Sequence, residues 1–311
     1  MIFAAAAVFY FTVRPGGREM PENTAPGGAV RPVQGIKIVA TENFYGDIAR
    51  QLGGADVTVR SIISNPNIDP HEYESTVQDG VAVMKADIVI KNGLEYDTWM
   101  DKLLSASPNS GRSVITAGDI APGRLPGNPH VWYGIVNMKA LAKTITGELK
   151  KRDPAHIAQF EKNLDAFNRS LTSLETKMNG IRSRFAGTPV GLTETICLYQ
   201  TGPMGLKVLT PLNFQRAISE GNEPAAADLA AAENQINNRK IKVLIYNSQT
   251  VTPVTTNLLN AAQARAIPVV PVTETMPDGS SYQSWMKAEL NALEKGLASK
   301  TGSLKEKAGN R

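Results

Sequence analysis

A long amphipathic pattern runs from Asp153 to Phe185 and constrains the fold more than any other feature of the chain. Asp153-Pro154 gives a capping residue followed by proline at the first helical position, and no glycine interrupts the pattern before Gly180. The apolar residues recur at steps of three or four, as on one face of an α-helix. They are Ile157, Phe160, Leu164, Phe167, Leu171, Leu174 and Met178. A helix of this length extends roughly 45 Å, more than one domain needs, so we expect a rigid helix that joins two lobes.

Short apolar runs alternate with amphipathic stretches on both sides of this helix. Before it, we expect strands at Ile36–Ala40, Val57–Ile63, Asp87–Lys91 and Ser113–Ala117, and helices at Phe44–Leu52, Val77–Lys85, Tyr96–Leu104 and Met138–Lys150. After it, we expect strands at Pro189–Thr193, Lys242–Tyr246 and Ile267–Val272, and helices at Pro224–Ile236, Thr255–Arg265 and Tyr282–Leu297. Such alternation is typical of βαβ units and parallel sheets. The predicted fold class is therefore α/β, with two parallel-sheet lobes of the solute-binding type joined by one long rigid helix.

The N-terminal segment has the composition of an export signal followed by a spacer. Met1–Val13 is apolar, too short for an ordinary membrane-spanning helix and close to the length of a signal-peptide core. No basic residue precedes it, whereas Arg14 and Arg18 follow it, which reverses the usual order. Pro15–Val33 is rich in proline and glycine, as in flexible linkers. We expect an exported protein, periplasmic or associated with the cell surface, for which the apolar segment is a candidate attachment.

These features predict five segments. They are a signal or anchor segment with a flexible spacer at 1–35, an N-terminal α/β lobe at 36–152, a linking helix at 153–186, a C-terminal α/β lobe at 187–298 and a tail at 299–311. The composition, 42% hydrophobic and 20% charged, is that of a soluble globular protein. The net charge of +4 is mild and the basic residues do not alternate with aromatic ones, so nucleic-acid binding is not indicated. The single cysteine, Cys197, excludes intrachain disulfides and thiolate metal clusters, and we expect it in the core.

Two of the three histidines occur in the same local setting. His71 follows Asp69-Pro70 and His130 follows Asn128-Pro129, so a proline of fixed φ precedes each imidazole. Neutral imidazole is the commonest metal ligand among side chains. A single Pro-His in a loop is usually surface decoration, but two of them suggest a site assembled from distant segments. His156, in the first turn of the long helix, is interpreted as a solvated residue.

The second lobe contains no histidine, so its candidate ligands are carboxylates. Glu194 follows the predicted strand Pro189–Thr193, and Glu274 follows the strand Ile267–Val272. Ligands of parallel α/β sheets bind beyond the carboxyl ends of the strands. An isolated carboxylate there is most often only an exposed loop residue. Together with two proline-braced imidazoles, however, two carboxylates provide the nitrogen and oxygen donors of a divalent cation site.

These motifs, with Asn92-Gly93-Leu94-Glu95 and Thr193-Glu194 followed by Tyr199, resemble those of the cluster A-I solute-binding proteins. Those proteins are the zinc- or manganese-capturing subunits of ABC importers, and the resemblance extends from about Ile36 to Leu297. It implies two lobes that clamp a transported divalent metal, Zn²⁺ or Mn²⁺, and deliver it to a membrane permease. It also implies the four metal ligands, which are His71, His130, Glu194 and Glu274. The expected partners are this permease and the metal ion, with no nucleic acid, and we expect a monomer.

Several departures from the family pattern leave alternatives open. Tyr133-Gly134 stands where the family often has Asp-Pro, and Glu274 stands where aspartate is usual, so Asp278 is an alternative fourth ligand. The zinc-type third histidine and histidine-rich loop are absent, and Glu194 resembles the manganese type. Carboxylates suit manganese, but zinc has the higher intrinsic affinity for almost any such site, so the metal remains open between the two.

The resemblance also leaves two other functions to compare. A metallohydrolase needs an open coordination position and a general base, whereas four ligands would close this site. No Ser-His-Asp spacing, nucleophile elbow or glycine-rich phosphate loop is present, so we expect no enzyme. The proline-rich leader and basic tail are compatible with an adhesion or interaction role on the same lobes. For metal capture, Glu72 and Glu74 are candidates to orient the imidazoles, and affinity should fall as the pH drops through roughly 6.5.

Overall fold

The computed structural model describes residues 35–299, with gaps at 66–67, 69 and 71–72. The predicted signal segment and nearly all of the C-terminal tail therefore lie outside the described residues. Among the helices that are described, none is both long enough and apolar enough to cross a membrane.

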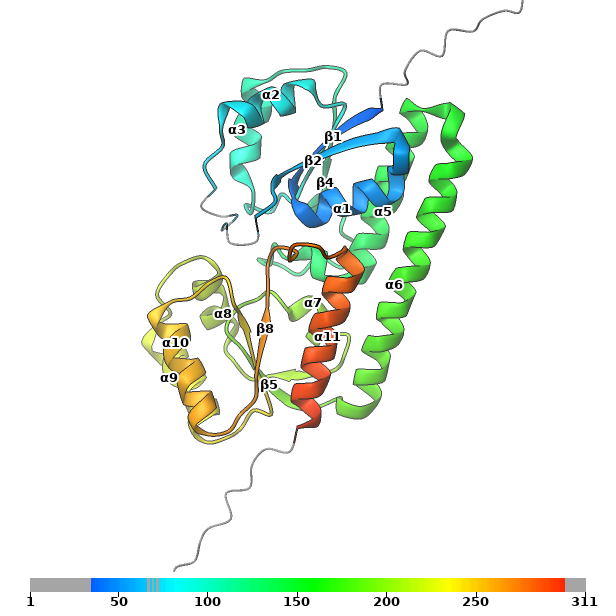
Figure 1. The fold of residues 1–311 in the computed structure, drawn as a ribbon. Coiled ribbons are helices and arrows are strands. Elements are labelled where there is room, and N and C mark those ends of the chain that lie inside the picture. The colour runs from blue at the N-terminus through cyan, green and yellow to red at the C-terminus, as the bar shows by residue number, and fades with distance from the viewer. Residues whose placement is uncertain (1–34, 66–67, 69, 71–72, 300–311) are drawn as a thin grey trace, which may run out of the picture. The chain divides into compact units, whose positions relative to one another are not determined.

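The first sheet has four parallel strands in the order β2-β1-β3-β4 (Figure 1). Its strands are β1 (Ile36–Glu42), β2 (Val57–Ile63), β3 (Ile88–Lys91) and β4 (Ser113–Thr116). Its helices are α1 (Asn43–Gly53), α2 (Val77–Lys85), α3 (Thr98–Ala106), α4 (Ala117–Ile120) and α5 (Ile135–Arg152). Every strand and helix expected before the long helix is present within a few residues of its predicted bounds. Thr76 caps α2 in a capping box, which explains why that helix begins where the sequence predicts.

The second sheet repeats the design with the order β6-β5-β7-β8, again all parallel. Its strands are β5 (Pro189–Leu192), β6 (Lys207–Val208), β7 (Leu244–Asn247) and β8 (Val269–Val272). Its helices are α7 (Leu198–Thr201), α8 (Leu212–Ser219), α9 (Ala226–Asn237), α10 (Pro253–Ala264) and α11 (Tyr282–Ala298). The sequence did not predict β6, α7 or α8. The two four-stranded parallel sheets confirm the predicted α/β class.

The long helix α6 (Ile157–Phe185) is a single helix of 29 residues beside α5, α1 and α11 (Figure 1). Its predicted apolar face packs inward at Phe160, Phe167, Leu171, Leu174 and Met178. The helical segment begins at Pro154, as predicted, with a first turn of 3₁₀ type, η4 (Pro154–His156), that leads directly into α6.

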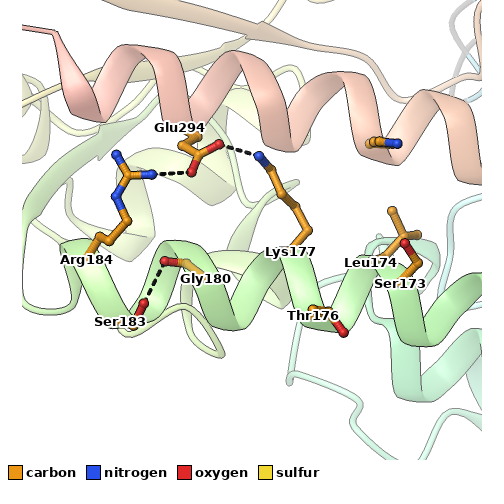
Figure 2. A pocket seen from close by; sticks show the side chains of 9 residues that line it. Ser173, Leu174, Thr176, Lys177, Gly180, Ser183, Arg184 and Glu294 are labelled. Carbon is orange, nitrogen blue, oxygen red and sulfur yellow. Dashed lines mark hydrogen bonds and ion pairs between the residues drawn. The ribbon is translucent and has the colours of Figure 1, made fainter.

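Helix α11 of the second lobe contacts α6 through ion pairs. Glu294 of α11 pairs with Lys177 and with Arg184 at 2.6 Å, both on α6 (Figure 2). The pairs line a surface cavity of about 420 Å³ between the two helices. Because the side chains are partly exposed, each pair stabilises the contact only weakly.

The carboxyl edges of the two sheets meet at one place. Asn43, which follows β1, exchanges two hydrogen bonds with the backbone of Met276, which lies beyond β8 (Nδ2 to O 2.6 Å, N to Oδ1 3.0 Å). Next to Asn43 in the sequence, Phe44 stacks on Trp132 with ring centroids 4.8 Å apart, and Trp285 of α11 packs against the same phenylalanine. The loops that follow the strands of both sheets are thereby brought to a common, largely buried interface.

Candidate metal centre

The turn at Asn128-Pro129 buries the imidazole of His130 completely. His130 immediately precedes a 3₁₀ turn, η3 (Val131–Tyr133), whose Trp132 packs edge-on against the imidazole at 5.2 Å between ring centroids. A buried imidazole needs partners for its polar atoms, because an unsatisfied polar group costs free energy away from water.

The hydrogen bonds of Asn128 determine which ring nitrogen of His130 carries the proton. The amide nitrogen Nδ2 of Asn128 donates to the carbonyl of Thr195 (2.8 Å), which identifies the other amide atom as oxygen. That oxygen accepts from the backbone N–H of His130 (3.0 Å) and lies 2.9 Å from Nδ1. Nδ1 must therefore be the donor, and in the neutral imidazole the lone pair is then at Nε2. Within the described residues Nε2 has no hydrogen-bond partner, and it lies 3.6 Å from Oε1 of Glu274.

The two carboxylates of the second lobe are buried and joined by one amide. Glu194, beyond β5, is 1% exposed and Glu274, beyond β8, is 4% exposed. Nδ2 of Asn247, the last residue of β7, lies 3.2 Å from Oε2 of Glu194 and 2.9 Å from Oε1 of Glu274. Because like charges repel strongly in a buried place, this arrangement favours a cation that neutralises both.

A strained loop beyond β3 brings Tyr96 to the same carboxylate. Gly93, Leu94 and Glu95 have φ values of 74°, 56° and 65°, so three consecutive residues are left-handed. For non-glycine residues this conformation costs about 1–3 kcal/mol each and persists only where surrounding contacts enforce it. Asp97 supplies two of these contacts, since its carboxylate accepts from the backbone N–H of Gly93 (2.8 Å) and from that of the preceding residue. The result is a hydrogen bond of 3.0 Å from the Tyr96 hydroxyl to Oε2 of Glu274.

Asn92 connects this loop to the His130 turn. Its Nδ2 donates to the carbonyl of Pro129 (3.0 Å), while its Oδ1 accepts from the hydroxyl of Tyr45 (2.6 Å). The motif Asn92-Gly93-Leu94-Glu95 therefore acts on both candidate ligands, on His130 through Pro129 and on Glu274 through Tyr96.

Of the four predicted ligands, the structure places Glu274 beside His130, with Oε1 and Nε2 3.6 Å apart, and Asn247 links Glu274 to Glu194. The described group whose ligand atoms all lie within 4.8 Å of one another is instead Asp56, Asp153 and His156. The fourth predicted ligand, His71, lies outside the described residues, as does Glu72. Asp278, the alternative fourth ligand, is exposed, whereas Glu274 is buried beside His130. Glu74 is exposed as well, and the residue that orients His130 is Asn128.

Neither Asn247 nor the hydroxyl of Tyr96 is among the residues predicted from the sequence to form the site. Asn247 had a usable signal, because it is a short polar residue at the carboxyl end of a predicted strand, where ligand groups gather. Tyr96 had none, since its position depends on a strained loop that no local pattern indicates.

A second group of ligand-type residues lies at the start of the long helix. His156 Nδ1 is 2.6 Å from Oδ2 of Asp153 and 3.8 Å from Oδ1 of Asp56. The imidazole is 40% exposed, as expected for a solvated residue. The hydrogen bond to Asp153 raises the pKa of His156, and the charges of Asp153 and Asp56 act in the same direction.

Cys197 is buried, as predicted, and is not a reactive group. Burial raises the pKa of its thiol, and the carboxylates of Glu289 and Glu194 raise it further. A thiol with a raised pKa is neither a nucleophile nor a thiolate ligand at neutral pH. The arrangement around His130 is therefore suited to holding a cation rather than to covalent chemistry.

Comparisons with known proteins agree with this geometry. The chain is 25% identical over 291 residues to the manganese ABC transporter substrate-binding lipoprotein scaA of Streptococcus gordonii, covering 85% of this chain and 89% of that protein. It is 30% identical over 155 residues to the iron-binding protein YfeA of Yersinia pestis, a match that spans 48% of this chain and 50% of the relative. The periplasmic zinc-binding protein TroA of Treponema pallidum has the same fold, with a TM-score of 0.72 at 20% identity over 85% of this chain and all of that chain.

The family assignment comes from a match over most of the chain. The family described as zinc-uptake complex component A, periplasmic, matches residues 38–296. These residues contain both sheets and the long helix, as well as the three candidate ligands that are described. The match confirms the resemblance carried by the sequence motifs. The chain belongs to the ZnuA family of zinc-uptake complex components.

Proposed function

We propose that the protein captures a manganese or zinc ion with four side chains of its two lobes and delivers it to the permease of an ABC importer. The proposed ligands are His71, His130, Glu194 and Glu274. As a member of its family the protein is a metal-binding solute-binding protein of ABC-type uptake, and it is not an enzyme.

The observation that carries the proposal is the setting of His130. A fully buried imidazole presents its bare Nε2 to a buried carboxylate 3.6 Å away. A divalent ion between them would occupy the lone pair of Nε2 and neutralise Glu274. Glu194 is held next to Glu274 by Asn247 and would add a second oxygen donor. His71 would complete a set of two nitrogen and two oxygen ligands, which is compatible with both zinc and manganese.

Metal content is the direct test of the proposal. The purified protein should carry about one equivalent of metal by elemental analysis, and His130→Ala should remove it. His156→Ala is the matched control, because it deletes the imidazole of the ion-paired cluster and should leave the metal in place. Retention of stoichiometric metal by His130→Ala would contradict the proposed site. Competition between Zn²⁺ and Mn²⁺ on the unsubstituted protein then decides which ion is held more tightly.

The location and the division of the chain are part of the same proposal. The protein would act outside the cytoplasmic membrane, exported by way of the 1–35 segment, as its periplasmic and lipoprotein relatives suggest. The lobes at 36–152 and 187–298 would form the two sides of the metal site. The helix at 153–186 would limit the movement of one lobe toward the other to a small rotation. Scattering curves with and without metal should then differ only slightly, and a large domain rotation would contradict the limit.

A further inference from the structure

Glu289 of α11 is a buried carboxyl group with three hydrogen-bonding neighbours. Its Oε1 accepts from the backbone N–H of Thr273 (2.9 Å) and from Nε1 of Trp285 (2.9 Å). Its Oε2 lies 2.9 Å from the hydroxyl of Tyr133. The residue is 8% exposed and belongs to none of the proposed ligands.

This single carboxyl group touches the segments that carry two proposed ligands. Thr273 directly precedes Glu274, and Tyr133 lies three residues after His130, in the turn η3. Tyr133 also stands where the sequence departs from the usual family pattern. The contacts of Glu289 therefore connect the first-lobe and second-lobe sides of the site.

The protons at this contact can be counted. The hydroxyl of Tyr133 lies 2.7 Å from the carbonyl of Thr273 and 2.9 Å from Oε2 of Glu289. If Glu289 is ionised, both neighbours are acceptors and compete for the one hydroxyl proton. If Glu289 is protonated, it donates to the oxygen of Tyr133, which in turn donates to Thr273, and every group is satisfied.

We propose that Glu289 is a positioning residue of the metal site and acts in its protonated form, through a hydrogen-bond chain from Glu289 to Tyr133 to the carbonyl of Thr273. The inference rests on the proposed function, because it concerns how His130 and Glu274 are held for the metal. An outer partner of this kind acts by fixing the position of the ligands.

The surroundings favour the protonated form. Burial raises the pKa of Glu289 to about 7, against the lowering effect of its hydrogen-bond donors. The titratable groups that interact with it are Tyr133 of η3, Cys197 before α7 and Tyr282 on its own helix, and Glu274 acts on Tyr133 in turn. The tyrosine and cysteine pKa values are themselves raised, so these groups are neutral near pH 7.

Three substitutions separate a positioning role from a merely structural one. Glu289→Gln copies the protonated group, because its amide nitrogen donates to Tyr133 while its oxygen accepts from Thr273. Glu289→Ala and Tyr133→Phe break the chain. Glu294→Gln is the matched control, since it makes the same change on a partly exposed, ion-paired residue of the same helix (Figure 2).

The test measures Zn²⁺ affinity by chelator competition at pH 6 and pH 8. Glu289→Ala and Tyr133→Phe should weaken binding by about 10-fold or more at pH 6, whereas Glu289→Gln and Glu294→Gln should bind as the unsubstituted protein does. As the pH rises to 8, Glu289 loses its proton in the unsubstituted protein, whereas the amide of Glu289→Gln does not titrate. The Zn²⁺ affinity of Glu289→Gln, divided by that of the unsubstituted protein, should therefore increase. Because both proteins contain the same histidines, imidazole titration cancels in that ratio.

A second readout needs no metal. The folded state holds the Glu289 proton more tightly than the unfolded chain, so stability falls as the pH rises from about 4.5 to about 7. Without metal, the thermal midpoint of Glu289→Gln minus that of the unsubstituted protein should therefore increase between pH 5 and pH 8. If Glu289→Ala does not fold, Tyr133→Phe and this pH series decide the matter.

Failure of the inference can be told from failure of the proposed function. If His130→Ala keeps its metal, the proposed function is wrong. If His130→Ala loses its metal while Glu289→Ala and Tyr133→Phe bind normally, only the positioning role is wrong. An affinity ratio and a midpoint difference that both stay constant with pH would overturn the protonated chain.

Discussion

The molecule contains two clusters of imidazole and carboxylate that differ in burial and in the partner of the ring. His130 is completely buried, and its Nε2 lies 3.6 Å from Glu274. The side chain of His156 is 40% exposed, and its Nδ1 lies 2.6 Å from Asp153 and 3.8 Å from Asp56. The residue types are the same, yet the two sites have different chemistry.

The partner of the ring nitrogen explains the difference. Nδ1 of His130 is bonded to a neutral amide, that of Asn128, which leaves Nε2 as a bare lone pair aimed at a carboxylate. His156 contacts its carboxylates directly, and they raise the pKa of its ring, so they favour a proton on the imidazole. Closeness of ligand-type residues does not by itself separate the two clusters, since the ligand atoms of His156, Asp153 and Asp56 all lie within 4.8 Å of one another. What distinguishes His130 is its neutral orienting group and its burial away from water.

The largest difference between the clusters should appear when a carboxylate charge is removed. Glu274→Gln takes away an anionic ligand and should reduce metal affinity by at least about 100-fold. Asp56→Asn makes the same kind of change in the His156 cluster and should leave affinity unchanged. Chelator competition at pH 7.5 measures both. An equal loss of metal affinity in the two variants would mean that Glu274 is not a ligand.

The orienting groups should give the next largest difference. Asn128→Ala removes the acceptor that holds Nδ1 of His130, so the imidazole can rotate and change tautomer, and metal affinity should fall about 10- to 100-fold. Asp153→Asn removes the corresponding partner of His156 and should not alter metal binding. Calorimetric titration with Zn²⁺ compares them. Normal affinity in Asn128→Ala would show that the turn alone fixes the ring.

Much of the fold could be predicted because each element carries a local pattern. Val57–Ile63 and Val77–Lys85 were predicted to the residue; the first is rich in β-branched residues, and the second begins after a capping residue, Thr76. More elements of the second lobe were missed. Helix α8 is only eight residues long with an exposed Leu212, and β6 has two residues, so neither produces a periodic signal.

The start of the long helix follows its local rule. Asp153-Pro154 predicts a helical segment with proline at its first position, and η4 begins at Pro154 and leads into α6 at Ile157. The rule does not specify the partner of Asp153, whose carboxylate is bonded to the imidazole of His156 and caps no backbone N–H.

The part of the candidate site that lies at the carboxyl ends of strands could be predicted from the sequence. Glu194 and Glu274 were expected near one another because both follow strands of one parallel sheet, and Asn247 now joins them. Contacts across the lobes, such as that of Tyr96 with Glu274, join residues far apart in the sequence. They depend on packing and backbone strain, which leave no periodic trace in the chain.

The smallest expected effect concerns the stability of the metal-free protein, where the His156 cluster should matter. The folded pKa of His156 is raised, first by its hydrogen bond to Asp153, so its stabilising effect is fully present below about pH 6.5 and is lost as the pH rises through the raised value. Asp153→Asn should lower the thermal midpoint at pH 6 and have less effect at pH 8. The shift should be small and should shrink with added salt, because the group is exposed. An equal shift at both pH values would indicate that Asp153 stabilises the joint between α5 and α6 by geometry alone, without the charge of His156.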